Sequence, residues 1–194
     1  MDAAPISWWL EEATPDESAS PLSGDHDADV AIVGGGYCGL WTALTVKQRA
    51  PELRVTLVEA ERCGHGPSGR NGGFLHGYWS MLGWLRDVLG DERALELARA
   101  GDGILPAVRA LGEDVWLREA GMLEVATTSQ QKHVLARAVD TARELGVPEE
   151  AVPLAPEEVD ARCRSPRFRG GVLFRECATV QPARLARALR RRTL

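Results

Sequence analysis

The sequence has 194 residues, of which 44% are hydrophobic and 26% are charged, and its net charge is −5. This composition is ordinary for one soluble domain and provides enough apolar residues for a core. The charge is uneven, because residues 160–194 hold ten arginines against two acids. These arginines are scattered through an expected strand and helix without interleaved aromatic residues, so we expect no nucleic-acid partner.

The cysteines and the apolar runs exclude several other kinds of protein. Successive cysteines lie 25, 100 and 14 positions apart, which leaves no C-x-x-C pair for a metal or redox site and is compatible with a reducing cytoplasm. The first residues lack the basic start and apolar run of a signal peptide. The uncharged run from Val30 to Val46 contains four glycines and reads as strand, turn and helix. We therefore expect a cytoplasmic protein with no membrane span.

The first 27 residues are acidic and rich in Pro, Ser and Ala, without sustained periodicity. Such a segment is typical of an arm that lies on a surface or stays mobile. Trp8 and Trp9 are expected to anchor this arm in an apolar groove, with contact to a partner protein as the alternative.

A strand, helix, strand order begins just after the arm. Val30–Val33 is a continuous apolar run, typical of a parallel strand buried on both faces. Helical spacing follows over Leu40–Arg49, and Val55–Val58 is a second run of the same kind. This order predicts the βαβ unit of a doubly wound sheet.

The remaining elements are expected from helical spacing, apolar runs and turn residues. The segment from Cys63 to Gly73 is mostly Gly with Ser, Pro and Asn, so it is expected to be neither helix nor regular strand. Helices are expected within Met81–Leu111, with breaks near Gly90 and Gly101–Gly103, and over Gln130–Leu145, Pro156–Arg162 and from Pro182 onward. Strands are expected over Val115–Glu119, Met122–Thr127 and Gly171–Arg175.

The first pattern that carries chemistry is GGGYCG at residues 34–39, a G-x-G-x-x-G directly after a strand and opening a helix. Gly34 permits the tight turn, Gly36 lets the backbone approach a pyrophosphate, and Gly39 lets the helix pack closely on the strand. The helix N-terminus then offers N–H groups to the phosphates. Glu59, twenty residues after Gly39, is placed to accept hydrogen bonds from a ribose diol. This acid disfavours NADP, but the pattern does not separate NAD from FAD.

The second pattern is GHGPSGRNGG at residues 64–73, which follows the acid where a chain lying along FAD would continue towards the flavin. Backbone N–H groups in such a loop can bind phosphate and flavin oxygens, and Arg70 and Asn71 add side-chain donors. The alternative is a flexible surface loop with a solvated arginine.

These segments resemble the D-amino-acid-oxidase-like FAD-dependent oxidoreductases, particularly the γ-glutamylputrescine oxidoreductase-like branch. The resemblance rests on DVAIVGGGYCGLWTAL, VTLVEAERCGHGPSGRNGGF, SWWL and GGVLFRECATVQPARLARAL, and it spans nearly the whole chain. It implies FAD as the cofactor, with ADP at the glycine turn and Glu59 and the flavin beside the loop. The residues expected to bind the cofactor are Gly34, Gly35, Gly36, Cys38, Gly39, Glu59, Ala60, Ser68, Gly69, Arg70, Asn71, Gly72 and Gly73.

The sequence departs from the family at two positions. Pro67 stands where a small Ala is common, which stiffens the loop without removing the pattern. Gly73 aligns with a His through which some relatives tether FAD, so we expect non-covalent FAD here.

The resemblance implies an α/β fold, with a doubly wound (Rossmann-like) FAD-binding domain and the start of a second α+β substrate domain. The expected divisions are an arm at 1–27, the βαβ unit and flavin loop at 28–75, a helical substrate-side region at 76–175 and a return helix at 176–194. The implied reaction is hydride transfer to flavin from a carbon next to an amine nitrogen, in a small amine or amino acid. A non-catalytic dinucleotide-binding module and an NAD-dependent dehydrogenase are the alternatives.

The final helix suggests that elements are missing. Its apolar residues Leu185, Ala186, Leu189 and Leu194 are expected to stay exposed, because no later element is present to cover them. The resemblance also implies a chain more than twice as long. We therefore expect an incomplete N-terminal portion with little turnover of its own, completed by a missing C-terminal half or by a second chain. No catalytic residue is assigned.

Overall fold

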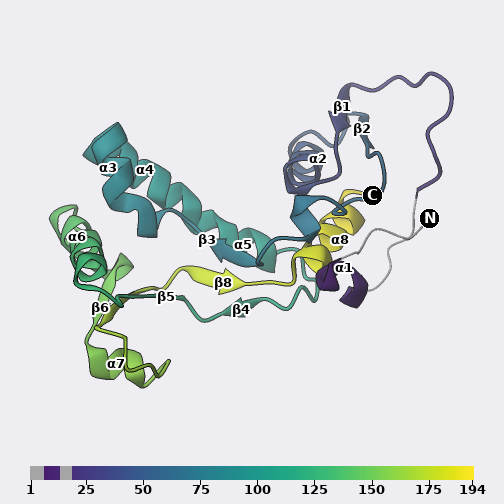
Figure 1. The fold of residues 1–194 in the computed structure, drawn as a ribbon. Coiled ribbons are helices and arrows are strands. Elements are labelled where there is room, and N and C mark those ends of the chain that lie inside the picture. Colours follow the sequence, from purple (N-terminus) through teal and green to yellow (C-terminus); the bar gives the residue numbers. More distant parts are fainter. Residues whose placement is uncertain (1–6, 14–18) are drawn as a thin grey trace. The chain divides into compact units, whose positions relative to one another are not determined.

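The computed structural model describes residues 7–13 and 19–194, and the chain divides into two compact units (Figure 1). Unit 1 contains the described residues up to Phe74 together with Leu111–Leu117 and Val180–Leu194. Unit 2 contains Leu75–Ala110 and Arg118–Thr179. The chain thus leaves the first unit and returns to it twice, at Leu111 and at Val180. The parts of the expected arm at 1–6 and 14–18 lie outside the described residues.

Unit 1 contains the expected βαβ unit. Strand β1 (Val30–Val33) pairs in parallel with β2 (Val55–Val58), and α2 (Tyr37–Arg49) connects them. A parallel pair requires a crossover connection of this kind, so the pairing confirms the predicted βαβ unit.

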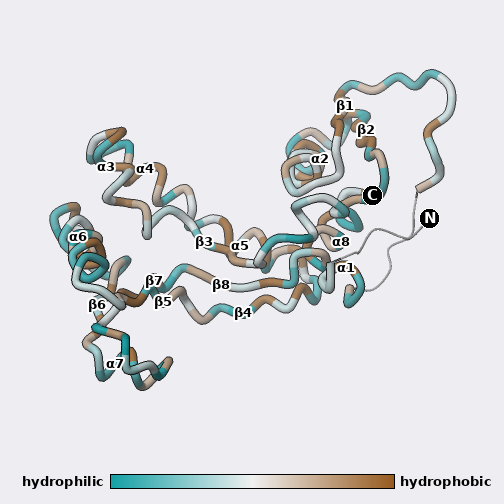
Figure 2. The backbone as a smooth tube through the Cα atoms, in the orientation of Figure 1, coloured by the Kyte–Doolittle hydropathy of each residue, from teal (hydrophilic) through white to brown (hydrophobic). Residues whose placement is uncertain are grey.

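The expectation that β1 is buried on both faces is wrong for the described part of the chain. A Cβ on Gly39 of α2 would lie 3.2 Å from the Ile32 side chain, so this residue faces the helix. Ala31 and Val33 point to the opposite face, and Val33 is 87% exposed. Both strands are apolar (Figure 2), but they form a two-stranded sheet with α2 packed on one side. One face is therefore left to solvent.

The expectation that the last helix exposes its apolar residues is also wrong for Leu185, Ala186 and Leu189, whereas Leu194 is 88% exposed, as expected. In α8 (Pro182–Thr193), Leu185 is 2% exposed and Ala186 and Leu189 are fully buried. The earlier α2, the 3-10 turn Pro67–Gly69 (η1) and the N-terminal α1 (Trp8–Glu12) pack against this helix and cover it. Elements that precede α8 in the sequence therefore provide the cover.

The N-terminal segment differs from an irregular arm, because it forms α1. Leu10 and Ala13 are its buried residues, and they pack with Ala183 and the partly buried Trp9. Trp8 is 58% exposed, but its ring lies beside that of Trp116, with the centroids 6.2 Å apart.

Unit 2 contains two small sheets with helices packed on one of them. The first sheet has the order β3-β8-β4, and the second, which is antiparallel, has the order β5-β7-β6. Helix α6 packs on the second sheet, α3 packs on α6, and α4 packs on α3. The bounds are β3 Phe74–His76, α3 Leu82–Leu89, α4 Asp91–Ala100, α5 Ile104–Arg109, β4 Arg118–Glu119, β5 Met122–Val125, α6 Ser129–Glu144, β6 Val152–Leu154, α7 Pro156–Asp160, β7 Gly171–Phe174 and β8 Cys177–Thr179.

The strand expected over Val115–Glu119 is shorter than predicted, because only β4 is extended at its end. Trp116 has a φ of 55°, in the left-handed region that interrupts an extended run. Its backbone N–H binds the carboxylate of Asp114 at 3.2 Å, which stabilises this turn.

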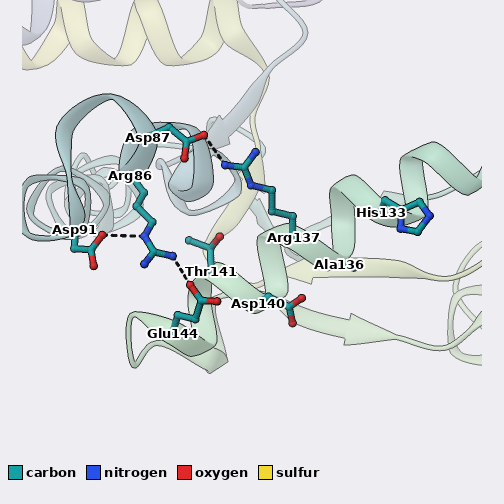
Figure 3. A pocket seen from close by; sticks show the side chains of 9 residues that line it. All are labelled: Arg86, Asp87, Asp91, His133, Ala136, Arg137, Asp140, Thr141 and Glu144. Atoms are coloured by element: carbon teal, nitrogen blue, oxygen red, sulfur yellow. Dashed lines mark hydrogen bonds and ion pairs between the residues drawn. The ribbon is translucent and has the colours of Figure 1, made fainter.

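Three helices of unit 2 meet at a polar surface groove of about 560 Å³. Arg86 of α3 pairs with Asp91 of α4 and with Glu144 of α6, and Arg137 of α6 pairs with Asp87 of α3 (Figure 3). The charged groups point toward one another, so the groove is lined by ion pairs that join the three helices. Exposed pairs of this kind each contribute little to stability.

A second polar cluster in unit 2 predicts a pH-dependent stability. The indole N–H of Trp79 donates to Asp102 at 2.7 Å and to Glu176 at 3.3 Å. Burial and the neighbouring Asp102 raise the pKa of Glu176 to about 7. A carboxyl whose pKa is higher in the folded than in the unfolded chain stabilises the fold below its unfolded pKa and loses that contribution as pH rises through the folded value.

The melting temperature of unit 2 is therefore expected to fall by a few degrees between pH 5 and pH 8 on account of Glu176. In Glu176→Gln the part of the melting-temperature decrease that is due to Glu176 should be absent. The control Glu96→Gln, at an exposed position, should show the same decrease as the unchanged protein. Thermal melting at the two pH values measures both. An identical pH dependence in Glu176→Gln would show that the carboxyl is already ionised at pH 5.

Candidate dinucleotide-binding site

The glycine turn that follows β1 brings the start of α2 close to the strand. Gly34 has a φ of +104° and donates its N–H to the Val58 carbonyl of β2 at 2.8 Å. A Cβ on Gly39 would lie only 2.0 Å from the Gly34 carbonyl oxygen, so a side chain at that position cannot be accommodated. Both glycines therefore act as the spacing predicts.

The N-terminus of α2 presents unpaired backbone donors. Gly36 is the N-cap and supplies no side-chain cap. In the described residues, the N–H groups of Gly36, Cys38 and Gly39 have no hydrogen-bond acceptor. Three donors at the positive end of a helix are a suitable site for phosphate. A pyrophosphate would satisfy them.

Glu59 lies at the end of β2 and contacts the same turn. Its Oε2 accepts the N–H of Gly35 at 2.7 Å, and its Oε1 accepts the N–H of Glu61 at 3.1 Å. These bonds, chiefly the one from Gly35, lower the pKa of the Glu59 carboxyl, so it is ionised at neutral pH. An ionised carboxylate has about four acceptor positions, which leaves about two for a ribose diol. The adjacent Ala60 is exposed.

The loop at residues 64–73 lies directly against the glycine turn. Ser68 Oγ accepts the N–H of Tyr37 at 2.9 Å, and the N–H of Gly64 donates to the Gly35 carbonyl at 2.8 Å. A Cβ on Gly36 would lie 3.0 Å from Ser68 Oγ. The structure therefore brings the two patterns of the sequence, which are separated by about 30 residues, into one site.

The second half of the loop is organised by Asn71. Its amide donates to the carbonyls of Pro67 at 3.2 Å and Ser68 at 2.9 Å, and its oxygen accepts the N–H of Gly73 at 2.8 Å. Arg70 is exposed, with Nε 3.4 Å from the Gly66 carbonyl, and Gly72 is exposed while Gly69 is buried. Asn71 thus shapes the loop, a role the sequence did not predict, and Arg70 remains at its surface.

Gly73 closes the loop against the start of α8. It has a φ of +72°, and a Cβ there would lie 2.2 Å from the Val180 carbonyl oxygen. The Val180 N–H donates to the Gly73 carbonyl at 2.8 Å. A histidine at this position is excluded by the geometry of the backbone.

Three residues of the site were missed in the sequence. The Tyr37 hydroxyl donates to the Pro182 carbonyl at 2.9 Å, and burial raises the pKa of Tyr37 to about 12, so it stays protonated. Gly64, with a φ of +76°, packs against Ala186 of α8, and Cys63 packs against Gly35. The glycine at 64 could have signalled a positive φ. Tyr37 occupies a variable position of the glycine pattern and carried no signal.

The sequence profile of the family "FAD dependent oxidoreductase" (DAO) matches residues 29–194. The chain belongs to the DAO family. Its expected cofactor, FAD, is confirmed by this membership.

Several DAO-family proteins are similar to the chain over part of their own length. γ-Glutamylputrescine oxidoreductase of Escherichia coli is 28% identical over 93% of this chain and 42% of its own. A probable oxidoreductase, OrdL, of Rhizobium meliloti is 42% identical over 46% of this chain and 21% of its own. The crystal structure of glycine oxidase from Geobacillus kaustophilus superposes with a TM-score of 0.69 at 26% identity, covering 87% of this chain and 45% of that one. The chain spans less than half the length of these relatives.

In the part of the chain that the structure describes, no helix is long and apolar enough to cross a bilayer.

Proposed function

We propose that the glycine turn, Glu59 and the 64–73 loop bind FAD, and that the protein containing this chain oxidises a small amine or amino acid in the cytoplasm. The observation that carries the proposal is the group of unpaired N–H donors at α2, with Glu59 on one side and the glycine loop on the other. This arrangement places donors for phosphate, at the start of α2, beside acceptors for a ribose, on Glu59.

Each part of the site has a separate task in this proposal. The N–H groups of Gly36, Cys38 and Gly39 bind the pyrophosphate, and Glu59 accepts the ribose hydroxyls. Ser68 and Asn71 hold the loop so that the N–H groups of its glycines can face the flavin end of the cofactor. FAD held there would supply the redox chemistry, as the acceptor of the hydride lost from the carbon next to the amine nitrogen.

The proposed substrate class comes from the relatives. One is a γ-glutamylputrescine oxidoreductase and another is a glycine oxidase, so the substrate class that we propose is a small amine or amino acid. We propose that unit 2 begins the substrate side of the protein and unit 1 the FAD side. No residue of the described chain is assigned to the chemical step, and no nucleic-acid or membrane partner is proposed.

Two other functions remain distinguishable by experiment. An NAD-dependent dehydrogenase would use the same glycine turn and acid but would have no use for a glycine loop beside them. A non-catalytic module would bind a dinucleotide without turnover in any assembly. The loop packed on the turn favours FAD over NAD. Turnover of an amine by the complete protein would exclude the non-catalytic module.

Replacing Glu59 by Gln is expected to weaken FAD binding about tenfold at pH 7, because a charge-assisted acceptor for the ribose becomes a neutral amide. Titration of flavin fluorescence measures the dissociation constant. Because the pKa of Glu59 is lowered in the folded chain, affinity in the unchanged protein should persist through pH 5 and fall only as the carboxyl is protonated in stronger acid.

The matched control for this substitution is Glu52→Gln, at an exposed position in the turn before β2. It should bind FAD like the unchanged protein. Equal affinity in Glu59→Gln and Glu52→Gln would mean that Glu59 does not contact the cofactor.

A further inference from the structure

The N-terminal helix α1 is held in place entirely by tertiary contacts. It has five residues, which is too short for a helix to be stable in water by itself. Leu10 and Ala13, which are 9% and 1% exposed, pack with Ala183 of α8. The position of α1 therefore depends on what it touches in unit 1.

A polar cluster beneath α1 connects it to the start of α8. Gln181 is fully buried, and its side-chain amide donates to the Trp9 carbonyl and to Glu12 Oε2, both at 2.7 Å. The Gln181 side-chain oxygen accepts the N–H of Arg184 at 2.9 Å. Arg184 in turn binds Glu12 through two nitrogens, at 2.6 and 3.2 Å. Glu12 is thus the acceptor shared by a buried amide and a guanidinium.

This ion pair is more shielded than an ordinary surface pair. The side chains of Arg184 and Glu12 are 22% and 19% exposed. Arg184 also lies over the ring of Trp116, at 4.5 Å from the centroid, and reaches Asp114 at 3.0 Å. Removal of Glu12 would leave the Gln181 amide with an unsatisfied donor, which is costly in a buried position.

The same cluster is in contact with the loop at 64–73 from two sides. Leu10 lies against the loop, since a Cβ on Gly69 would be 3.0 Å from its Cδ2. Val180, the residue before Gln181, donates its N–H to the Gly73 carbonyl at 2.8 Å. A shift of α1 or of Gln181 would therefore reach both the middle and the end of the loop.

We propose that α1 is a positioning element for the loop at 64–73, and that Glu12 is the positioning residue, acting through Gln181 and Arg184. The proposal rests on the proposed function in one respect, since the loop is taken to bind FAD. Among the described residues, the hydrogen-bond partners of Glu12 are Gln181 and Arg184, and neither belongs to the loop at 64–73. The effect of Glu12 on affinity is to keep the loop in its binding geometry before FAD arrives, which lowers the ordering cost of binding.

The test compares Glu12→Ala with Glu11→Ala in the full chain. Glu11 is the adjacent residue of α1 and is exposed, so its removal controls for helix composition and net charge. Flavin titration is expected to show about tenfold weaker FAD binding for Glu12→Ala and unchanged binding for Glu11→Ala. Glu12→Gln, which keeps an acceptor for Gln181 but loses the charge, should lie between them and takes over the test if Glu12→Ala does not fold.

Hydrogen exchange of the FAD-free proteins distinguishes a local effect on the loop from a general loss of stability. The amides of residues 64–73 and of Val180 should exchange faster in Glu12→Ala, whereas those of α6 in unit 2 should be unchanged. Equal acceleration in both units, or no acceleration in the loop, overturns the proposal. A parent chain that fails to bind FAD counts against the proposed function instead, and the exchange comparison still decides the role of α1.

Discussion

Replacement of Gly36 by Val should lower the affinity for FAD by at least about a hundredfold while the chain remains folded. A Cβ at this position would lie 3.0 Å from Ser68 Oγ, closer than side chains normally approach. The branched side chain would push Ser68 away from the N–H of Tyr37 and would also fill the space in front of the three unpaired donors of α2. The phosphate would then lose both its N–H donors and the space that it occupies in front of them.

Flavin titration and thermal melting of Gly36→Val measure the two parts of this expectation separately. Gly83→Ala is the control, because Gly83 lies in α3 of unit 2 and an added Cβ there has Thr141 Oγ1 at an ordinary 3.5 Å. It should bind FAD normally. A Gly36→Val protein with unchanged affinity would place the phosphate site elsewhere.

Replacement of Gly39 by Val should have the largest effect on the fold, with unit 1 destabilised by roughly 3 kcal/mol or more. The added Cβ would lie 2.0 Å from the Gly34 carbonyl oxygen and 3.2 Å from the Ile32 side chain. The first contact is with backbone, which cannot turn aside as a long side chain can. Helix α2 would have to move off β1, and α8, which is packed on α2, would lose its cover.

Urea unfolding followed by circular dichroism measures this loss. Gly83→Ala again serves as the control and should be neutral or more stable by up to about 1 kcal/mol, since Ala is the better helix former. If Gly39→Val unfolds at the same urea concentration as the unchanged chain, the close packing of α2 on the glycine turn is not present in solution.

The sequence predicts the elements that depend on local patterns. β1 and β2 occupy the residues expected from their continuous apolar runs, and the helical region after residue 81 breaks at Gly90 and Gly101–Gly103 as predicted. By contrast, β3, β6 and β8 have three residues each, which is too short for a periodicity to be recognised. The left-handed Trp116 could not be expected either, because a bulky residue rarely adopts this conformation.

The candidate site was predictable to the extent that spacing defines it. The glycines and Glu59 meet as the fingerprint implies, since Gly34 has a positive φ and Gly39 lies against the Gly34 backbone. The contacts of Tyr37 with Ser68 and with Pro182 join residues 31 and 145 positions apart, and no local pattern reports them. The same limit explains why α8 was expected to be exposed: its cover comes from α1, α2 and the loop, which are distant in sequence.

The most direct test of the account is the identity of the dinucleotide that the chain retains. The purified protein is incubated with equal amounts of FAD and NAD, freed of unbound ligand and precipitated with acid, and the supernatant is analysed by mass spectrometry. The account predicts FAD, released into the supernatant because residue 73, the position aligned with the tethering histidine of some relatives, is a glycine. Recovery of NAD alone, or of neither dinucleotide, would contradict the assignment of the glycine turn and loop as an FAD site.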